Sequence, residues 1–343
     1  MKRTGNLWDK IISKENLYIA YRKARRGKAW QKKVKRIDDR TSYFLGKLHN
    51  ILADGRYHTS SYKTKVIYEP KMRTIYILPF YPDRIIHHAI MNVLEPIWDK
   101  LFIEHSYACR LGKGQHKGSK YCMSLVRKYK YCLKCDISKF YPSINHQIMK
   151  TIIRKKIKDE RLLKLLDEII DSIEGNTNVP IGNYLSQWFG NLYLNELDML
   201  IKHHYHFKAY LRYCDDFLLF SDDKEELHKI AAELKVFLAD KLKLKMSKCD
   251  VFPTTRGVDF LGYRHFPQGY ILVRKATAKR MKKRMRGVLW NYKHHKITKI
   301  QALSQIASTE GWLKHANTYN FSVSLQLDKL KECITNERFS KTS

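Results

Sequence analysis

Two aspartates stand side by side inside an apolar stretch, RYCDDFLLF at residues 212–220. The flanking aromatic and aliphatic residues predict a buried or half-buried strand, where adjacent like charges are unfavourable. One explanation is that Asp215 and Asp216 form the tight turn of a hairpin over residues 208–221. The other is that a divalent cation binds there, because hard cations prefer carboxylate oxygens. The rest of the sequence distinguishes between these explanations.

The charge of the chain favours a polyanionic partner. Its 343 residues include 66 Lys and Arg against 33 Asp and Glu, a formal net charge of +33. Self-repulsion on this scale destabilises a compact state unless a partner such as RNA or DNA neutralises it. A basic surface without any partner is the alternative.

The basic residues gather in two segments. Residues 1–40 hold 14 Lys and Arg in a helical pattern interleaved with aromatic residues, and residues 274–300 hold eleven with no acid. Both segments indicate phosphate contact, or otherwise solvated helix surfaces. The shift in composition places a domain boundary near 274.

Several other classes of protein are disfavoured. The sequence has no run of about 18 apolar residues and no apolar signal-peptide core, so we expect no membrane span. Seven cysteines, an odd number, suggest reduced thiols and a cytoplasmic setting. Cys132 and Cys135 lie in an alternating strand without a second pair at zinc-site spacing, so we expect core thiols rather than a zinc or redox site.

The order of expected elements is that of an α+β fold, with helices covering one face of a mostly antiparallel sheet. We expect a hairpin at 65–80 with its turn at 69–71, a helix at 83–100 opened by Asp83, a strand at 130–137 that ends at Asp136, helices at 147–173 and 185–205, the hairpin at 208–221, a helix at 223–243, short strands at 250–273 and helices to 335.

Asp136 supplies a third carboxylate. If its strand neighbours the hairpin, the three acids converge at one sheet edge, where they would repel each other unless a cation binds. Two such ions about 3.5–4 Å apart can clamp the attacking and leaving oxygens of a phosphoryl transfer. In a basic chain this suggests a polymerase. Adjacent aspartates alone are a weak signal, but a YxDD hairpin about 80 residues after a strand-terminal aspartate is a stronger one.

These motifs, in this order, resemble the reverse transcriptases over most of residues 65–320. The matching stretches are RTIYILPF, RIIHHAI, SYACRLGKG, CDISKFYPSIN, YCDD, LKLKMSKCDVF, VDFLGYRH and GWLKHANTYNF. The resemblance implies a right-hand polymerase fold. It divides the chain into basic helices and fingers at 1–105, a palm at 106–273 with a fingers insertion near 150–190, and a thumb at 274–343.

The resemblance also assigns site residues. Asp136, Asp215 and Asp216 would be catalytic and, with the Ile137 carbonyl, would bind two Mg²⁺ ions, for which Mn²⁺ can substitute. The incoming dNTP would be bound by Arg73, Tyr141, Ile181 and Lys248. The template and fidelity would depend on Arg84, Ile181, Gly182, Ser186 and Gln187. The primer and nucleic-acid backbone would contact Gly262, Tyr263, Arg274, Lys275, Lys279, Arg280, Lys282 and Lys283.

Two of these assignments have plain structural alternatives. Tyr141 would exclude a 2′-hydroxyl from the dNTP sugar, or it could merely pack as one of 22 tyrosines.

The stretch IGNYLSQ at 181–187 resembles the enzymes of diversity-generating retroelements, where most reverse transcriptases have QGxxxSP. Ile181 cannot hydrogen-bond, so base-pair geometry would be checked loosely. Alternatively, Ile181 is an ordinary apolar strand residue and Gln187 a polar residue at a helix N-terminus.

The resemblance therefore implies an error-prone RNA-directed DNA polymerase that copies a retroelement template RNA, misincorporates at its adenines and supplies cDNA for a variable gene. Expected partners are template RNA, the cDNA primer–template duplex, dNTPs and a basic oligomeric accessory protein, in the cytoplasm of a bacterial, phage or archaeal host. The alternatives are a retron or group II intron-like reverse transcriptase, and a non-catalytic RNA-binding protein on a polymerase scaffold.

Overall fold

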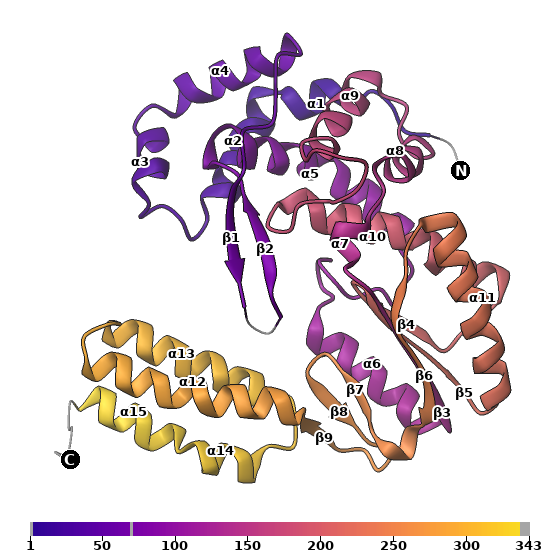
Figure 1. Cartoon of the computed structure of the whole chain (residues 1–343). Helices are drawn as coiled ribbons and strands as arrows, with labels where there is room; N and C mark the ends of the chain where they lie inside the picture. Colours follow the sequence, from indigo (N-terminus) through magenta and orange to yellow (C-terminus); the bar gives the residue numbers. More distant parts are fainter. Residues whose placement is uncertain (1–2, 69–70, 337–343) are drawn as a thin grey trace. The chain divides into compact units, whose positions relative to one another are not determined.

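The computed structural model describes residues 3–68 and 71–336. The chain mixes helices and strands and forms two compact units, each built from three separate segments (Figure 1). The first unit takes the residues up to Leu111 with Cys135–Lys208 and Ile230–Cys249, and the second takes Gly112–Lys134, Ala209–Lys229 and the residues from Asp250 onward. The chain therefore passes repeatedly from one unit to the other.

The first unit opens with helices and a hairpin. Its elements are α1 (Trp8–Ile12), α2 (Lys14–Arg25), α3 (Lys32–Asp38), α4 (Thr41–Ala53), β1 (Lys63–Ile67), β2 (Arg73–Ile77) and α5 (Ile85–Trp98). Strands β1 and β2 pair antiparallel as expected, while Glu69 and Pro70 of the expected turn lie outside the described residues. Asp83 does not open α5. It is buried and accepts hydrogen bonds from the Tyr57 hydroxyl at 2.7 Å and the Ser60 amide at 3.0 Å.

The expectation of one helix over 147–173 is wrong. The structure has α7 (Phe140–Ser143), α8 (His146–Arg154) and α9 (Glu160–Ile170), followed by α10 (Tyr184–Met199). Between α8 and α9, Ile157 forms a parallel bridge with Thr4. Asp159 then caps α9 by accepting from the Leu162 amide at 3.3 Å.

The second unit contains α6 (Gln115–Lys128), the hairpin β4 (Tyr210–Tyr213) and β5 (Asp216–Ser221), and the small sheet of β7 (Val258–Phe260), β8 (Tyr263–His265) and β9 (Ile271–Val273). The unit boundary passes through β3 (Tyr131–Ile137), α11 (Lys224–Leu242) and β6 (Met246–Pro253). The larger sheet has the strand order β4-β5-β3-β6. Cys132 and Cys135 are fully buried in β3, in agreement with the prediction that they belong to the core.

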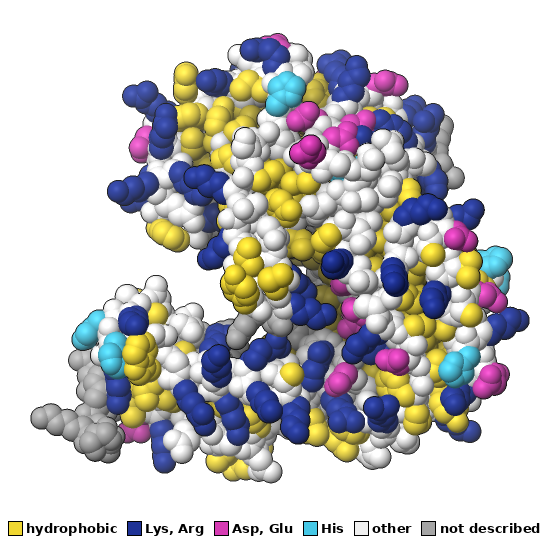
Figure 2. Space-filling view, in the orientation of Figure 1, with side chains coloured by type: hydrophobic (Ala, Val, Ile, Leu, Met, Phe, Trp, Pro, Cys, Tyr) yellow, Lys and Arg dark blue, Asp and Glu magenta, His cyan; other side chains and the backbone are white. Residues whose placement is uncertain are grey.

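Four helices end the described part of the second unit: α12 (Lys275–Lys293), α13 (Lys299–Leu313), α14 (Tyr319–Leu325) and α15 (Leu327–Thr335). A shared apolar cluster that includes Met285, Ile306 and Ile334 holds them together. Lys and Arg side chains gather over α12 (Figure 2). Within residues 3–68 and 71–336, no helix is both long and apolar enough to cross a bilayer.

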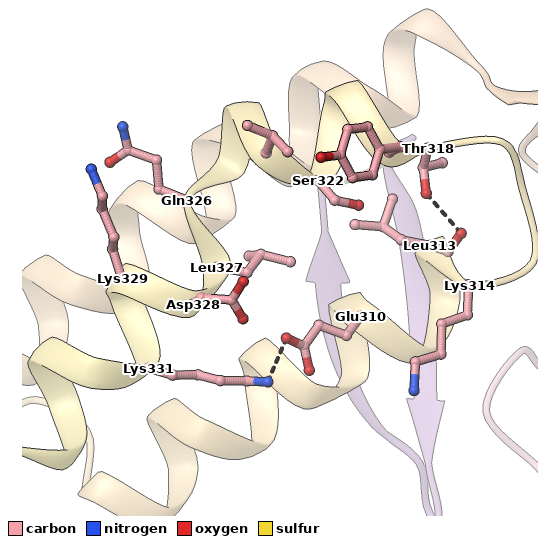
Figure 3. Close-up of a pocket in the computed structure, with 12 residues that line it drawn as sticks. Glu310, Leu313, Lys314, Thr318, Ser322, Gln326, Leu327, Asp328, Lys329 and Lys331 are labelled. Atoms are coloured by element: carbon pink, nitrogen blue, oxygen red, sulfur yellow. Dashed lines mark hydrogen bonds and ion pairs between the residues drawn. The ribbon is translucent and has the colours of Figure 1, made fainter.

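Helices α13, α14 and α15 enclose a cavity of about 710 Å³ (Figure 3). On one side of it Lys331 forms an ion pair with Glu310, and on the other the Thr318 hydroxyl donates to the Leu313 carbonyl at 3.0 Å. These polar groups are engaged with each other. The cavity therefore has the character of a gap between packed helices.

Candidate active site

The two adjacent aspartates lie in the turn and at the start of a strand. Tyr213 of β4 pairs with Asp216 of β5, so Cys214 and Asp215 form a two-residue turn between them. Cys214 has φ +54°, a left-handed conformation that costs a non-glycine residue roughly 1–3 kcal/mol. The buried Arg212 side chain stabilises the turn by donating from Nη1 to the Cys214 carbonyl at 3.1 Å. The expected hairpin is confirmed, with its turn at Cys214 and Asp215 and with Asp216 already in the second strand.

Asp216 has a basic neighbour on β3 of the same unit. The Nζ of Lys134 lies 3.7 Å from its Oδ2, and the two side chains are 15% and 25% exposed. The two side chains form a partly buried ion pair. Asp215 is therefore the turn carboxylate and Asp216 the one placed beside a lysine.

Asp136 lies in the first unit, on the part of β3 that ends at Ile137. It is half-buried, and the Ser247 hydroxyl of β6 donates to its Oδ2 at 2.6 Å and lies 3.1 Å from its backbone oxygen. Ile137 is 2% exposed. The hydroxyl of Ser247 thus fixes the orientation of the Asp136 carboxylate.

The chemistry of these donors suits a hard divalent cation, because carboxylate and carbonyl oxygens are the ligands that Mg²⁺ prefers. Among the described residues, no three His, Cys, Asp or Glu side chains are already gathered as a metal-binding group. Magnesium is commonly bound by one or two carboxylates together with substrate phosphates rather than by an all-protein cage.

Tyr141 packs against a glycine of α10 in the first unit. A Cβ on Gly190 would lie 3.2 Å from Tyr141 Cε1 and 3.1 Å from Phe140 Cε1. The Tyr141 carbonyl accepts from the Val179 amide at 3.0 Å. The ring is half-buried, so packing accounts for one of its faces and leaves part of it accessible.

The IGNYLSQ segment forms the turn before α10 and its first helical turn. Ile181 lies in the turn rather than in a strand, and its carbonyl accepts from the Tyr76 amide of β2 at 2.8 Å. Ser186 is buried and its hydroxyl donates to the Pro180 carbonyl at 2.7 Å, so it holds the turn from inside and is not available to a template. Gln187 is exposed on the first turn of α10.

The remaining predicted contacts of the first unit are dispersed. Arg73 is exposed at the start of β2, Lys248 is exposed on β6, and Arg84 is half-buried just before α5. Arg84 shares a cavity with Gly182 and Gln187. The structure thus brings three of the five predicted template residues to one cavity and places Arg73 and Lys248, two of the predicted dNTP-binding residues, on separate strands.

In the second unit, Gly262 and Tyr263 pack against the C-terminal helices. The ring of Tyr263 is fully buried and stacks on Trp312 with centroids 4.1 Å apart, and its hydroxyl donates to the Trp312 carbonyl at 3.0 Å. Packing on Trp312 therefore accounts for the burial of the Tyr263 ring. The predicted cations of α12 are exposed on its surface, namely Lys275, Lys279, Arg280, Lys282 and Lys283, and Arg274 stands half-buried at its N-cap.

The family model described as reverse transcriptase (RNA-dependent DNA polymerase) matches residues 63–265, more than half of the chain. The chain belongs to the reverse transcriptase family. This match includes the Asp136 strand, the YCDD hairpin and IGNYLSQ. The α+β layout predicted from the sequence agrees with it.

Curated relatives point in the same direction. Protein YkfC of Escherichia coli K12 is 24% identical over 54% of this chain and 61% of the relative. The group II intron-encoded protein LtrA of Lactococcus lactis is 22% identical over 75% of this chain and 56% of the relative. The chain thus spans less than two thirds of the length of these relatives. Among solved structures, that of telomerase from Candida albicans is similar over 88% of this chain and 66% of the telomerase chain. The TM-score is 0.45 and the sequence identity is 13%.

Sequence reasoning missed several residues of this reverse transcriptase-family site. Ser247 and Lys134 contact predicted carboxylates, but they stand in segments with no signal of their own beyond a polar residue in a strand. Gly190 had a usable signal, because glycine inside a helix costs about 1 kcal/mol and usually has a packing reason. Cys214 had no such signal, because a cysteine in a sequence does not predict a left-handed backbone conformation.

Proposed function

We propose that the chain is an RNA-directed DNA polymerase in which Asp136, Asp215 and Asp216 act together as the catalytic carboxylates. The observation that carries the proposal is the strained Cys214–Asp215 turn, held by the buried Arg212, which presents two acids at a strand end inside the matched family region. Strained backbone persists where the surrounding structure enforces it, and such positions concentrate at functional sites. The right-hand fold with fingers, palm and thumb is part of the same proposal.

The proposed roles follow from the local contacts. Bound Mg²⁺ would supply charge neutralisation and a lowered pKa for the attacking hydroxyl. Ser247 orients the Asp136 carboxylate through its 2.6 Å hydrogen bond, and Lys134 lies 3.7 Å from the Asp216 carboxylate. Tyr141 presents a flat ring, backed by Gly190, where it would meet the sugar of the nucleotide.

Primer extension on an RNA template tests this proposal. With Mg²⁺, dNTPs and an annealed DNA primer, Asp215→Asn and Asp216→Asn are expected to lower cDNA synthesis by at least about 10²-fold, because lost electrostatic stabilisation of a transition state has effects of that size. Asp222→Asn, in the loop after β5, is the matched control. Equal cDNA from wild type and the two hairpin variants would favour a non-catalytic RNA-binding protein.

We further propose that copying is error-prone at template adenines, as in diversity-generating retroelements, with a structured template RNA and a basic oligomeric accessory protein as partners. The support is the IGNYLSQ segment: Ile181 stands in the turn that pairs with β2, where an aliphatic side chain offers no hydrogen bond. The similarity to LtrA instead favours a group II intron-like enzyme. A retron enzyme, which would prime from a 2′-hydroxyl of its own RNA, is a third candidate.

Ile181→Gln separates these possibilities. If Ile181 loosens base-pair checking, the variant should lower misincorporation at template adenines several-fold while errors at other template bases change little. Sequencing of cDNA made on one defined RNA measures this, with Ile75→Gln on the neighbouring β2 as control. An unchanged error rate at adenines in Ile181→Gln would remove Ile181 from the account of fidelity.

A further inference from the structure

Two cysteines of the first unit lie against each other, across the strands that hold the Asp136 carboxylate. Cys135 is on β3 directly before Asp136, and Cys249 is on β6 two residues after Ser247. These strands are neighbours in the sheet. The two sulfur atoms are 3.9 Å apart. The chemistry proposed above for the carboxylates uses neither thiol.

The two sulfurs are too far apart for a bond but close enough to form one. A disulfide joins its sulfurs at about 2.03–2.05 Å and usually separates its Cα atoms by about 4.4–6.8 Å. Neighbouring strands of a sheet lie about 4.7–4.9 Å apart, which is within that range. Closing the gap between Cys135 and Cys249 therefore requires side-chain rotation and a small shift of the strands, not a change of fold.

The two thiols differ in their access to solvent. Cys135 is fully buried, whereas Cys249 is exposed. An oxidant from solution therefore reaches Cys249 first, and the buried sulfur 3.9 Å away is placed to attack the product. Redox-sensing cysteines often combine an accessible thiol with a resolving thiol beside it. This pair has both parts of that arrangement.

The cysteine nearest to Cys135 in the sequence is a poor partner for it. Cys132 lies three positions earlier in β3, and side chains at an odd separation along a strand point to opposite faces. Burial raises the pKa of Cys132 well above the usual range of a thiol, so it stays protonated and reacts slowly. The contact with Cys249 joins residues 114 positions apart, so the CxxC spacing gave no indication of it.

We propose that Cys135 and Cys249 form a reversible disulfide when the protein meets a small-molecule disulfide such as oxidised glutathione, and that this bond switches off the candidate active site. The switch rests on the proposed polymerase function. Bond formation draws the two sulfurs together by about 2 Å, next to Asp136 and to the Ser247 that orients it. Misplacement of reacting groups by about 1 Å can lower a rate about 10²-fold.

The reaction is thiol–disulfide exchange in two steps. The deprotonated sulfur of Cys249 attacks one sulfur of oxidised glutathione, whose own S–S bond breaks as one glutathione leaves. The sulfur of Cys135 then attacks Cys249 Sγ, the mixed S–S bond breaks, and the second glutathione leaves. The protein loses two electrons and two thiol protons, and oxidised glutathione takes up both to become two glutathione thiols. Because one sulfur of the new bond is exposed, excess glutathione reverses both steps.

Peptide mapping of the full chain tests the disulfide independently of activity. Reduced protein is incubated with oxidised glutathione, remaining thiols are blocked with N-ethylmaleimide, and tryptic peptides are analysed without reduction by mass spectrometry. Trypsin places the three cysteines of β3 and β6 on separate peptides, residues 131–134, 135–139 and 249–256. We expect peptides 135–139 and 249–256 to be joined, and the joined species to disappear in excess glutathione. A Cys249 that stays unmodified or stops at the mixed disulfide would overturn the proposal.

Cysteine variants test the order of the steps. In Cys135→Ala the exposed sulfur has no resolving partner, so peptide 249–256 should retain glutathione. Cys249→Ser should abolish the joined species, and because this position is exposed it keeps the test valid if Cys135→Ala folds poorly. Cys109→Ser removes another exposed thiol of the first unit and should leave the yield of joined peptide unchanged. Equal losses in Cys109→Ser and Cys249→Ser would contradict the assignment to Cys249.

Primer extension tests the effect of the disulfide on the candidate active site. Oxidised wild type should make at least about tenfold less cDNA than reduced wild type, because Asp136 is displaced, and should recover in excess glutathione. Cys249→Ser should make equal amounts of cDNA before and after treatment. Joined peptide with unchanged cDNA synthesis would overturn the switch.

The two assays keep this proposal apart from the proposed function. Reduced protein that makes cDNA but never forms the joined peptide defeats the disulfide and leaves the polymerase standing. Reduced protein that forms the joined peptide but makes no cDNA defeats the polymerase, and with it the switch, while the disulfide itself is confirmed.

Discussion

At the scale of single residues, glycine is required at position 182 because the turn before α10 passes β2 at close range. Gly182 has φ +117°, and a Cβ built on it would lie 2.6 Å from the Tyr76 carbonyl oxygen and 2.9 Å from Ile75 Cγ2. Backbone rather than a flexible side chain blocks the space. The turn that carries IGNYLSQ is therefore fixed by the absence of a side chain.

Gly182→Ala should lower the free energy of unfolding by about 2–5 kcal/mol, because strain at positive φ and the clash with Tyr76 add together. Urea unfolding followed by circular dichroism measures the loss. Gly46→Ala is the matched control, since Gly46 is helical and has nothing within 4 Å of a built Cβ, so a change of at most about 1 kcal/mol towards stability is expected. Similar stability in both variants would mean that the turn shifts freely.

Single residues also show the limits of sequence. The three carboxylates could be selected because charges in apolar strands are unusual and demand an explanation. The residues that orient these carboxylates could not be selected from the sequence, because Ser247 is 111 residues away from Asp136 along the chain. Tyr263 was assigned to the nucleic acid from a motif, whereas the contact that buries it is with Trp312 of a distant helix.

At the scale of elements, apolar periodicity predicted most helices but not their ends. The hairpins appear near their predicted places, and α11 agrees with the expected helix at 223–243 to within one residue at each end. The helix expected at 147–173 breaks because Asp159 accepts hydrogen bonds from the Leu7 and Trp8 amides at 2.8 and 3.0 Å. Local periodicity carries no information about such a contact with the other end of the sequence.

A histidine cluster joins α6, β8 and the segment after α13 in the second unit. The hydroxyl of Ser119 lies 2.7 Å from His265 Nε2 and 2.8 Å from His315 Nε2, and His315 stacks on His116 with centroids 4.4 Å apart. Burial lowers the pKa of His265 to about 4 and also lowers the pKa of His315, with His116 and Lys120 as further causes. Asp259 and Lys134 act on His265 in opposite directions.

The cluster predicts acid sensitivity. The unfolded chain binds a proton at this histidine near pH 6.5, whereas folded His265 stays neutral to about pH 4, so stability is full above pH 6.5 and falls as the pH drops towards 4. His265→Phe should make that fall shallower by up to about 1.4 kcal/mol per pH unit. Urea unfolding between pH 7 and 4.5 measures it, with exposed His228→Gln as control. An unchanged slope in His265→Phe would remove His265 as a cause.

At the scale of the whole molecule, the net charge of +33 has one dense and exposed source in α12, which carries basic side chains over much of its surface (Figure 2). Each phosphate that a Lys or Arg neutralises releases counterions, so binding weakens as salt rises. Composition alone predicted a polyanionic partner. The structure adds that the cations of α12 lie together on the exposed surface of one helix.

Lys275→Gln combined with Lys279→Gln should weaken binding of an RNA–DNA duplex regardless of its sequence. The slope of log K against log salt should become shallower by about 2, or about one per lost phosphate contact. Fluorescence anisotropy between 50 and 300 mM salt measures the slope. Lys224→Gln at the start of α11 serves as the control, and a slope equal to that of wild type in the double variant would place the duplex elsewhere.

The interleaving of the two units constrains how the chain can be made. The first unit is not complete until Ile230–Cys249 has been synthesised, and the second begins with Gly112–Lys134, long before its last segment. Until the last segments are synthesised both units are unfinished, and strand β3 is made before both of its neighbours in the sheet, β5 and β6. Neither unit can therefore be produced as a contiguous fragment of the chain.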